Sequence, residues 1–123
     1  MAASHQVLSP AVATQLRTMM EAVVDVKGAT GTQAAVNGYR VAGKTGTGKR
    51  LIDGRYTRYN AGSFVGMAPA DNPRFVIGVF ADVPNGTGGS VAAPAFSKMM
   101  SFALAHYRVP PSGTKPPKFK IYP

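Results

Sequence analysis

The clearest candidate for chemistry in this chain is a lysine set among small hydroxyl and glycine residues. The stretch 37–47 reads NGYRVAGKTGT, and from Gly38 to Thr45 it satisfies G-x-x-x-x-G-K-[ST], the pattern of phosphate-binding loops. Taken as Lys-Thr-Gly-Thr over residues 44–47, the same letters instead suit a strand beside an acyl-transfer site. The secondary structure that follows Lys44 distinguishes these two hypotheses.

A phosphate-binding loop requires a helix that begins at Lys44, so that the backbone amides of its first turn face the phosphates. Gly46, Gly48 and Gly54 follow instead, and each glycine inside a helix costs about 1 kcal/mol relative to alanine. The middle of the motif, Tyr-Arg-Val-Ala, favours a strand. One feature supports the nucleotide hypothesis: the apolar segment FVIGVFAD ends at Asp82, where such proteins place a metal-binding aspartate.

Composition limits the chain to one small domain. It has 123 residues and a mass of 12.8 kDa, and its hydrophobic content of 45% is compatible with folding. It has no cysteine, which excludes disulfides, thiolate metal sites and thiol nucleophiles. No apolar run reaches the length of a membrane span, and the N-terminus lacks a signal-peptide pattern. We therefore expect any membrane attachment to come from a segment outside this chain.

A net charge of +9 adds a third hypothesis, a small basic module that binds nucleic acid. Basic residues are concentrated between positions 40 and 58, and tyrosines that could stack on bases are interleaved with them. The basic residues are Arg40, Lys44, Lys49, Arg50, Arg55 and Arg58, and the tyrosines are Tyr39, Tyr56 and Tyr59. The same patch would also suit an anionic peptide terminus.

Two segments have the apolar spacing of amphipathic helices. Ser9 can cap a helix over residues 10–26, with Pro10 at its first position. We expect its apolar stripe to face the core: Val12, Leu16, Met19, Met20 and Val23. A second helix is predicted over residues 92–107, with the stripe Ala92, Phe96, Met99, Met100, Ala103 and Tyr107. Residues 110–123 are rich in proline and lysine, so we expect an extended and poorly packed tail.

Three extended segments complete the prediction of an α+β fold. Residues 34–47 indicate one or two short strands, and residues 60–68 and 74–82 indicate an antiparallel hairpin across the turn-forming PADNP. The polar, glycine-bearing residues 48–58 predict a loop. The segment 74–82 is apolar on both faces, which is typical of a strand in the middle of a sheet. The chain is thus predicted to supply about three antiparallel strands of a larger sheet.

The segment GYRVAGKTGTGKR resembles the third signature of the penicillin-binding proteins and serine β-lactamases. LSPAVATQLRTMMEAVV, NAGSFVGMAPADNPRFVIGVFADVP and GGSVAAPAF extend the resemblance to the C-terminal part of a class B penicillin-binding protein transpeptidase domain, of the division type, over about residues 5–109. The resemblance implies a partial penicillin-binding/β-lactamase-like fold. It assigns residues 1–109 to the transpeptidase domain and leaves residues 110–123 as a C-terminal tail.

The resemblance also implies roles for the Lys-Thr-Gly-Thr residues. Lys44 and Thr47 would be catalytic: the Lys44 ammonium would assist proton transfer near the nucleophile, and the Thr47 backbone N–H would donate to the oxyanion. The Thr45 and Thr47 hydroxyls, with Lys44 nearby, would bind the terminal carboxylate of a D-Ala-D-Ala stem peptide or of a β-lactam. Gly46 would let the substrate backbone lie close to the strand.

The serine nucleophile that the resemblance requires is not found in the chain. The one S-x-x-K, Ser112 to Lys115, lies downstream in the tail, and we interpret it as a chance match because nothing there would hold a nucleophile. No Ser-x-Asn element occurs, and neither His5 nor His106 has an acidic partner at a telling spacing. We therefore expect a C-terminal fragment, or one chain of a split transpeptidase domain, that is inactive alone.

Partners and location follow from the resemblance. We expect peptidoglycan stem peptides and β-lactams as ligands, and the remaining N-terminal half of the transpeptidase domain as a partner. The resemblance implies no cofactor, no metal ion and no nucleic acid. It places the parent protein on the extracytoplasmic face of the bacterial cell membrane. The alternatives left open are a P-loop nucleotide-binding protein and a small basic nucleic-acid-binding module.

Overall fold

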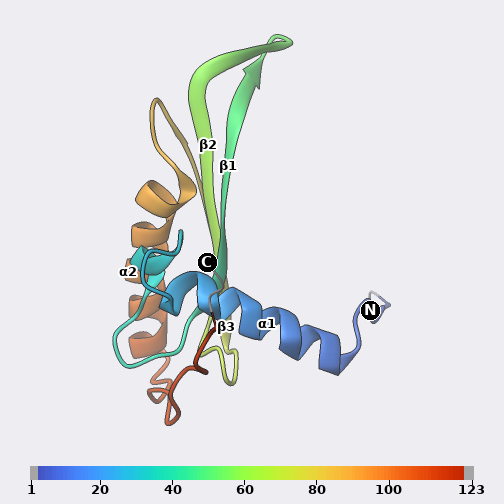
Figure 1. Ribbon diagram of the computed structural model, residues 1–123, viewed down its shortest axis with the longest axis vertical. Coiled ribbons are helices and arrows are strands. Elements are labelled where there is room, and N and C mark those ends of the chain that lie inside the picture. The colour runs from blue at the N-terminus through green and yellow to red at the C-terminus, as the bar shows by residue number, and fades with distance from the viewer. Residues whose placement is uncertain (1–2, 121–123) are drawn as a thin grey trace.

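The computed structural model describes residues 3–120 and has an α+β fold, in which a three-stranded antiparallel sheet packs against two helices (Figure 1). The strand order is β1-β2-β3, which puts β2 in the middle. The elements are α1 (Pro10–Asp25), β1 (Ala42–Ile52), β2 (Arg55–Ala68), β3 (Phe75–Val83) and α2 (Ala93–His106). The predicted fold class is confirmed, and so are both helices.

The predicted hairpin between residues 60–68 and 74–82 is confirmed, but the predicted loop over residues 48–58 is wrong. Strands β1 and β2 continue through this segment and pair as far as Ile52 and Arg55. Asp53 and Gly54 make the turn, with φ of 50° and 75°. Positive φ at both central residues suits a two-residue hairpin turn. The resulting two-stranded arm projects well beyond the helices (Figure 1).

The predicted position of the third strand in the middle of a larger sheet stays a prediction, because its second neighbour would come from outside this chain. Among residues 3–120, β3 pairs only with β2 and therefore forms an edge of the sheet. Val76 and Phe80, on one face of β3, are 65% and 75% exposed. Ile77 and Val79, on the other face, pack against the core. The described part of the chain covers only one of the two apolar faces of this strand.

Helix α2 covers one face of the sheet and supplies four residues of the core cluster, Ala93, Phe96, Met100 and Leu104. The rings of Phe64 on β2 and Phe96 on α2 lie 4.8 Å apart between centroids, and both side chains are fully buried. Phe96 and Met100 face the core as predicted, whereas Met99 and Tyr107 of the predicted stripe are exposed. Leu104, which the predicted stripe omits, is fully buried because it follows Phe96 and Met100 at helical spacing.

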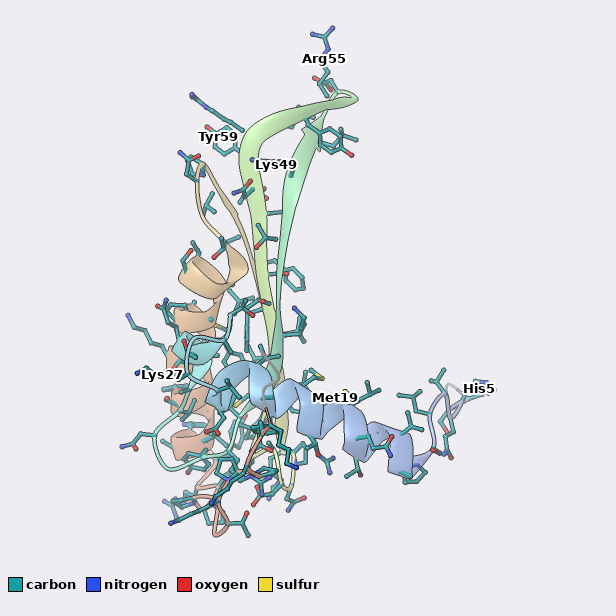
Figure 2. The ribbon with its side chains drawn as sticks, viewed as in Figure 1. His5, Met19, Lys27, Lys49, Arg55 and Tyr59 are labelled. Atoms are coloured by element: carbon teal, nitrogen blue, oxygen red, sulfur yellow. The ribbon has the colours of Figure 1, made fainter. Side chains whose placement is uncertain are left out.

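Helix α1 begins as predicted but does not bury its predicted stripe. The Ser9 side chain accepts a hydrogen bond from the Val12 amide at 3.3 Å. Leu16 and Met19 are 41% and 61% exposed, and the N-terminal half of the helix points away from the sheet (Figure 2). Only the C-terminal end of α1 reaches the core, through Val24. No helix in the described range is long and apolar enough to span a membrane.

Residues 110–120 have no helix or strand and are mostly exposed, as predicted for the tail, but Val109 just before them and Ser112 within them contact the rest of the chain. Val109 is buried in the core cluster, and its carbonyl oxygen accepts a hydrogen bond from the Tyr39 hydroxyl at 2.5 Å. Ser112 exchanges hydrogen bonds with the segment before β1: its amide donates to the Gly38 carbonyl, and its hydroxyl accepts from the Arg40 amide. These contacts hold the tail against the base of the sheet.

Candidate functional site

Residues 44–47 lie extended within β1, as the acyl-transfer hypothesis predicts. Their strand is an edge of the sheet, because β1 pairs only with β2 among the described residues. A phosphate-binding loop would need a helix beginning at Lys44, and the chain continues there as strand to Ile52. The nucleotide-binding alternative is therefore wrong.

The site side chains alternate between the two faces of β1. Lys44 is paired with Val65, is exposed, and donates from Nζ to the Thr45 carbonyl oxygen at 2.9 Å. Thr45 is paired with Phe64, so its side chain lies on the face that α2 covers, and Thr47 shares that face. The structure thus separates the lysine from the two hydroxyls by face, and brings all three to one exposed edge.

The two threonines lie beside a hollow of about 360 Å³. Thr45 Oγ1 is 2.9 Å from Thr30 Oγ1, and the Gly88 N–H donates to Thr47 Oγ1 at 3.0 Å. Most of the lining residues carry a hydroxyl group, and none is acidic: Ala29, Thr30, Thr32, Gln33, Thr45, Thr47, Thr87, Gly89 and Ser90. Such a surface offers hydrogen-bond donors to an anion without a repelling charge.

The far wall of the hollow is the start of the α2 region. Thr87 and Ser90 form a capping box, in which the Ser90 amide donates to Thr87 Oγ1 at 3.2 Å and the Thr87 amide donates to Ser90 Oγ at 3.0 Å. A π-helical turn, Gly88–Ala92, leads from this cap into α2. The sequence patterns considered above gave Thr30, Thr87 and Ser90 no role. The Thr-x-x-Ser spacing before an apolar helix was the signal that could have identified the cap.

Packing gives a reason for glycine at position 46. A Cβ added to Gly46 would lie 2.5 Å from Oγ of Ser63, its partner across β2. That distance is shorter than any ordinary van der Waals contact, so one side chain would have to move. The close approach of substrate to Gly46 remains a prediction.

The basic and aromatic residues of the predicted patch are dispersed. Arg40 lies in an ion pair with Glu21, with 2.7 Å between Nε and Oε1, and hydrogen bonding to this carboxylate raises the pKa of Arg40. Arg50 pairs with Asp82, the aspartate of the metal-binding hypothesis. Lys49, Arg55 and Tyr59 lie on the projecting arm (Figure 2). The Tyr39 hydroxyl is engaged by the tail, so the three tyrosines do not form one stacking platform.

The hydrogen bonds of Ser112 indicate a structural role. Its hydroxyl accepts from the Arg40 amide at 2.9 Å and donates to Asp71 at 3.3 Å, so the expectation that nothing holds it is wrong. It is absent from the lining of the hollow beside Thr47. Among residues 3–120, no three His, Cys, Asp or Glu side chains gather as a metal site would require.

Known families were compared with the chain as a whole. Residues 2–101 match the family model described as the penicillin binding protein transpeptidase domain. Stage V sporulation protein D of Bacillus subtilis is 45% identical over 97% of this chain, and the match spans 18% of that protein. Peptidoglycan D,D-transpeptidase FtsI of Buchnera aphidicola is 44% identical over 79% of this chain, again across 18% of the relative. The chain thus spans less than a fifth of these relatives.

Solved structures of penicillin-binding proteins also match the chain. The transpeptidase domain of penicillin-binding protein 3 from Burkholderia pseudomallei superimposes with a TM-score of 0.75 and 41% identity, covering 87% of this chain and 33% of that domain. Penicillin-binding protein 3 from Mycobacterium tuberculosis, in complex with ampicillin, superimposes with a TM-score of 0.75 and 37% identity. That match covers 89% of this chain and 27% of the mycobacterial one.

Proposed function

This chain belongs to the penicillin-binding protein transpeptidase domain family, and on that premise we propose that it supplies the substrate-binding edge of a peptidoglycan D,D-transpeptidase site. Its ligands would be D-Ala-D-Ala stem peptides and the β-lactams that resemble them. The observation that carries the proposal is the extended Lys-Thr-Gly-Thr segment on an exposed strand edge, with two threonines beside a hydroxyl-lined hollow.

The proposed roles follow from the chemistry of the groups. The hydroxyls of Thr45 and Thr47 would hold the terminal carboxylate, since hydroxyl donors and a nearby cation together suit an anion. Lys44 would supply that cation and an ammonium group that assists proton transfer at the nucleophile. Charge-assisted hydrogen bonds are about twice as strong as neutral ones, so Lys44 and the two threonine hydroxyls should contribute most to ligand affinity.

Acyl transfer also needs stabilisation of the oxygen that becomes negatively charged when the carbonyl carbon is attacked. We assign one donor for this oxygen to the Thr47 backbone N–H. A fixed donor of this kind lowers the barrier by about 3 kcal/mol in enzymes where it has been removed. Gly46 would keep the strand surface clear so that the substrate backbone can reach this donor.

The nucleophile would come from residues other than these 123. Ser112, which begins the one S-x-x-K of the chain, is bonded to Arg40 and Asp71 at the base of the sheet. The remaining N-terminal half of the transpeptidase domain would carry the serine and cover the Lys44 side of the cleft. Because peptidoglycan lies outside the cytoplasmic membrane, the assembled site would work on its extracytoplasmic face.

A chimaera tests the proposal directly. Residues 5–109 would replace the equivalent segment of the Mycobacterium tuberculosis protein. That protein is a suitable host because its structure has been solved in complex with ampicillin. We expect the chimaera to form a stoichiometric covalent ampicillin adduct, detected by intact-mass spectrometry. Lys44→Ala and Thr47→Val in the chimaera should slow adduct formation by about 100-fold and 10-fold respectively.

Two controls make the chimaera decisive. Lys49→Ala removes a neighbouring cation on the same strand and should leave the rate within about twofold, because its side chain lies on the projecting arm (Figure 2). The 123-residue chain alone should form no adduct. A folded chimaera that is acylated equally fast with and without Lys44 would refute the proposed role of the strand.

A further inference from the structure

We propose that Gly88 is a positioning residue that fixes the Thr47 hydroxyl as a hydrogen-bond donor toward the ligand carboxylate. This inference rests on the proposed function and adds a residue 41 positions away in sequence. Gly88 lies in the turn that leads into α2, and its amide nitrogen is 3.0 Å from Thr47 Oγ1.

The direction of this hydrogen bond is set by chemistry. A backbone N–H can only donate, so Thr47 Oγ1 must accept, and the hydroxyl hydrogen must point away from Gly88. No other hydrogen bond of the Thr47 side chain occurs among residues 3–120. The hydroxyl hydrogen therefore remains available for a ligand in the hollow that Thr47 lines.

Thr45 provides a contrast beside it. Its hydroxyl is 2.9 Å from the Thr30 hydroxyl, and either of these two groups can donate to the other. Thr45 can therefore present a hydrogen or a lone pair to a ligand, depending on which way the pair is arranged. Of the two threonines, only Thr47 has its hydroxyl oriented by a backbone amide, so that its hydrogen points away from Gly88.

Only glycine allows the approach that makes this bond. A Cβ on Gly88 would collide with the carbonyl oxygens of Ser63 and Gly46, and would lie 3.0 Å from the Gly46 nitrogen. Those atoms belong to the backbone of β1 and β2, which cannot move aside as a flexible side chain can. An alanine at this position would push the turn away from the strand and lengthen the bond to Thr47.

The consequence is selectivity for a carboxylate terminus. A carboxylate has only acceptor oxygens and forms a charge-assisted bond with a donor hydroxyl. A terminal amide is neutral, so its hydrogen bond with the Thr47 hydroxyl lacks this charge assistance. We therefore expect the site to prefer the acid over the amide by about tenfold, and to lose this preference when Thr47 is free to rotate.

The first experiment tests the bond in the ligand-free 123-residue chain by amide hydrogen exchange of Gly88, measured by NMR. Thr47→Val removes the acceptor and should speed exchange of the Gly88 amide by about tenfold, whereas Thr47→Ser keeps the hydroxyl and should leave it within about twofold. Equal exchange in wild type and Thr47→Val would overturn the inference, and this result does not depend on any ligand or on a Gly88 variant folding.

The second experiment tests the consequence by titrating the ¹⁵N-labelled chain with N-acetyl-D-Ala-D-Ala and with its C-terminal amide. Gly88→Ala should bring the acid-to-amide affinity ratio from about ten to about one, and Thr47→Val should do the same without a further loss in the double variant. Gly113→Ala is the matched control, because a Cβ there meets no atom within 4 Å.

The outcomes separate the two proposals. A wild-type chain that binds neither ligand, or binds both equally, counts against the proposed function and the inference together. A wild-type preference for the acid that survives in folded Gly88→Ala supports the proposed function and overturns the role of Gly88. If Gly88→Ala fails to fold, comparison of Thr47→Ser with Thr47→Val decides, because the acid preference should survive in the serine variant alone.

Discussion

The two faces of the sheet are made by alternate residues of the same strands, yet their surroundings differ. On the covered face, under α2, Phe64 is fully buried between the strand neighbours and Phe96. On the open face, the next residue along β2, Val65, is 37% exposed, and Phe80 on β3 is 75% exposed. Both faces are apolar, but the described chain supplies a cover for only one of them.

This difference shows what an apolar pattern specifies and what it leaves open. Alternation along a strand fixes which side chains share a face. It does not say what covers that face. In β3 both faces are apolar, as in strands buried between two layers, and the open face lies on the same side of β1 as Lys44. Its cover would therefore come from the part of the transpeptidase domain that we propose carries the nucleophile.

The sharpest test of the comparison is to truncate one phenylalanine on each face. Phe64→Ala removes a fully buried ring and should lower the free energy of unfolding by about 4 kcal/mol. Phe80→Ala removes a ring that is mostly in water and should change it by less than about 0.5 kcal/mol. Urea unfolding followed by circular dichroism measures both. Similar losses for the two variants would mean that the open face is covered in solution, by a second copy for example.

The next largest effect should come from the ion pair between α1 and the segment before β1. Arg40→Met leaves the Glu21 carboxylate, whose side chain is 3% exposed, without its partner, and should cost about 3 kcal/mol. The double variant Glu21→Leu, Arg40→Met removes both charges and should recover most of that loss. Thermal unfolding of the two variants provides the comparison. A double variant as unstable as Arg40→Met would show that Arg40 acts through its bonds to the tail.

Two glycines of β1 extend the comparison to the strand that carries the site. A Cβ at Gly43 would lie 2.7 Å from Cε1 of Phe64 and 2.9 Å from the Val65 carbonyl oxygen, so Gly43→Ala should destabilise the fold by about 2 kcal/mol. A Cβ at Gly48 meets nothing within 4 Å, so Gly48→Ala should stay within about 0.5 kcal/mol. Gly43 lies on the covered face and Gly48 on the open one, so the melting temperatures of the two variants test whether the two faces of β1 differ in packing.

Local sequence signals predicted the parts of the fold that depend on near neighbours. Ser9-Pro10 located the start of α1, and the PADNP turn located the hairpin of β2 and β3. The arm over residues 48–58 was missed because a ribbon with water on both sides has no apolar alternation, and Asp53-Gly54 was its one strong cue. The exposure of the α1 stripe depends on what covers that helix, which no periodicity encodes.

For the candidate site, too, the sequence predicted what depends on near neighbours and missed what depends on distant ones. The glycines after Lys44 correctly indicated that no helix begins there, which excluded a phosphate-binding loop, although Tyr39 and Val41, which favoured a strand, lie just before β1 begins at Ala42. The hydrogen-bond partners of Thr45 and Thr47 could not be predicted, because the Thr30 hydroxyl lies 15 residues before Thr45 and the Gly88 amide lies 41 residues after Thr47. Ser112 was misjudged for the same reason, since its hydrogen bonds are to Arg40 and Asp71, far back in the sequence.

The smallest expected effect concerns the tail, which is held by polar contacts and not by apolar packing. Unlike the covered face, the contact between the tail and the β2–β3 turn rests on Asp71, which accepts hydrogen bonds from Thr114 at 2.9 Å and from Ser112 at 3.3 Å. Desolvation alone would raise the pKa of Asp71. The bonds from Thr114, from its own backbone and from Ser112, together with the charge of Arg40, outweigh it and hold the pKa below 3.8.

The sign of the resulting pH dependence follows from linkage. Because the unfolded chain binds a proton at Asp71 at higher pH than the folded chain does, this contribution is fully present above pH 3.8 and is lost as the pH falls through the folded pKa. Asp71→Asn should therefore flatten the stability curve between about pH 5 and pH 2, and Thr114→Val should flatten it partly. Urea unfolding at several pH values in this range measures the slopes, with Thr18→Val as the matched threonine control on exposed α1. A wild-type slope that Asp71→Asn leaves unchanged would mean that the tail, like the covered face, is held by packing alone.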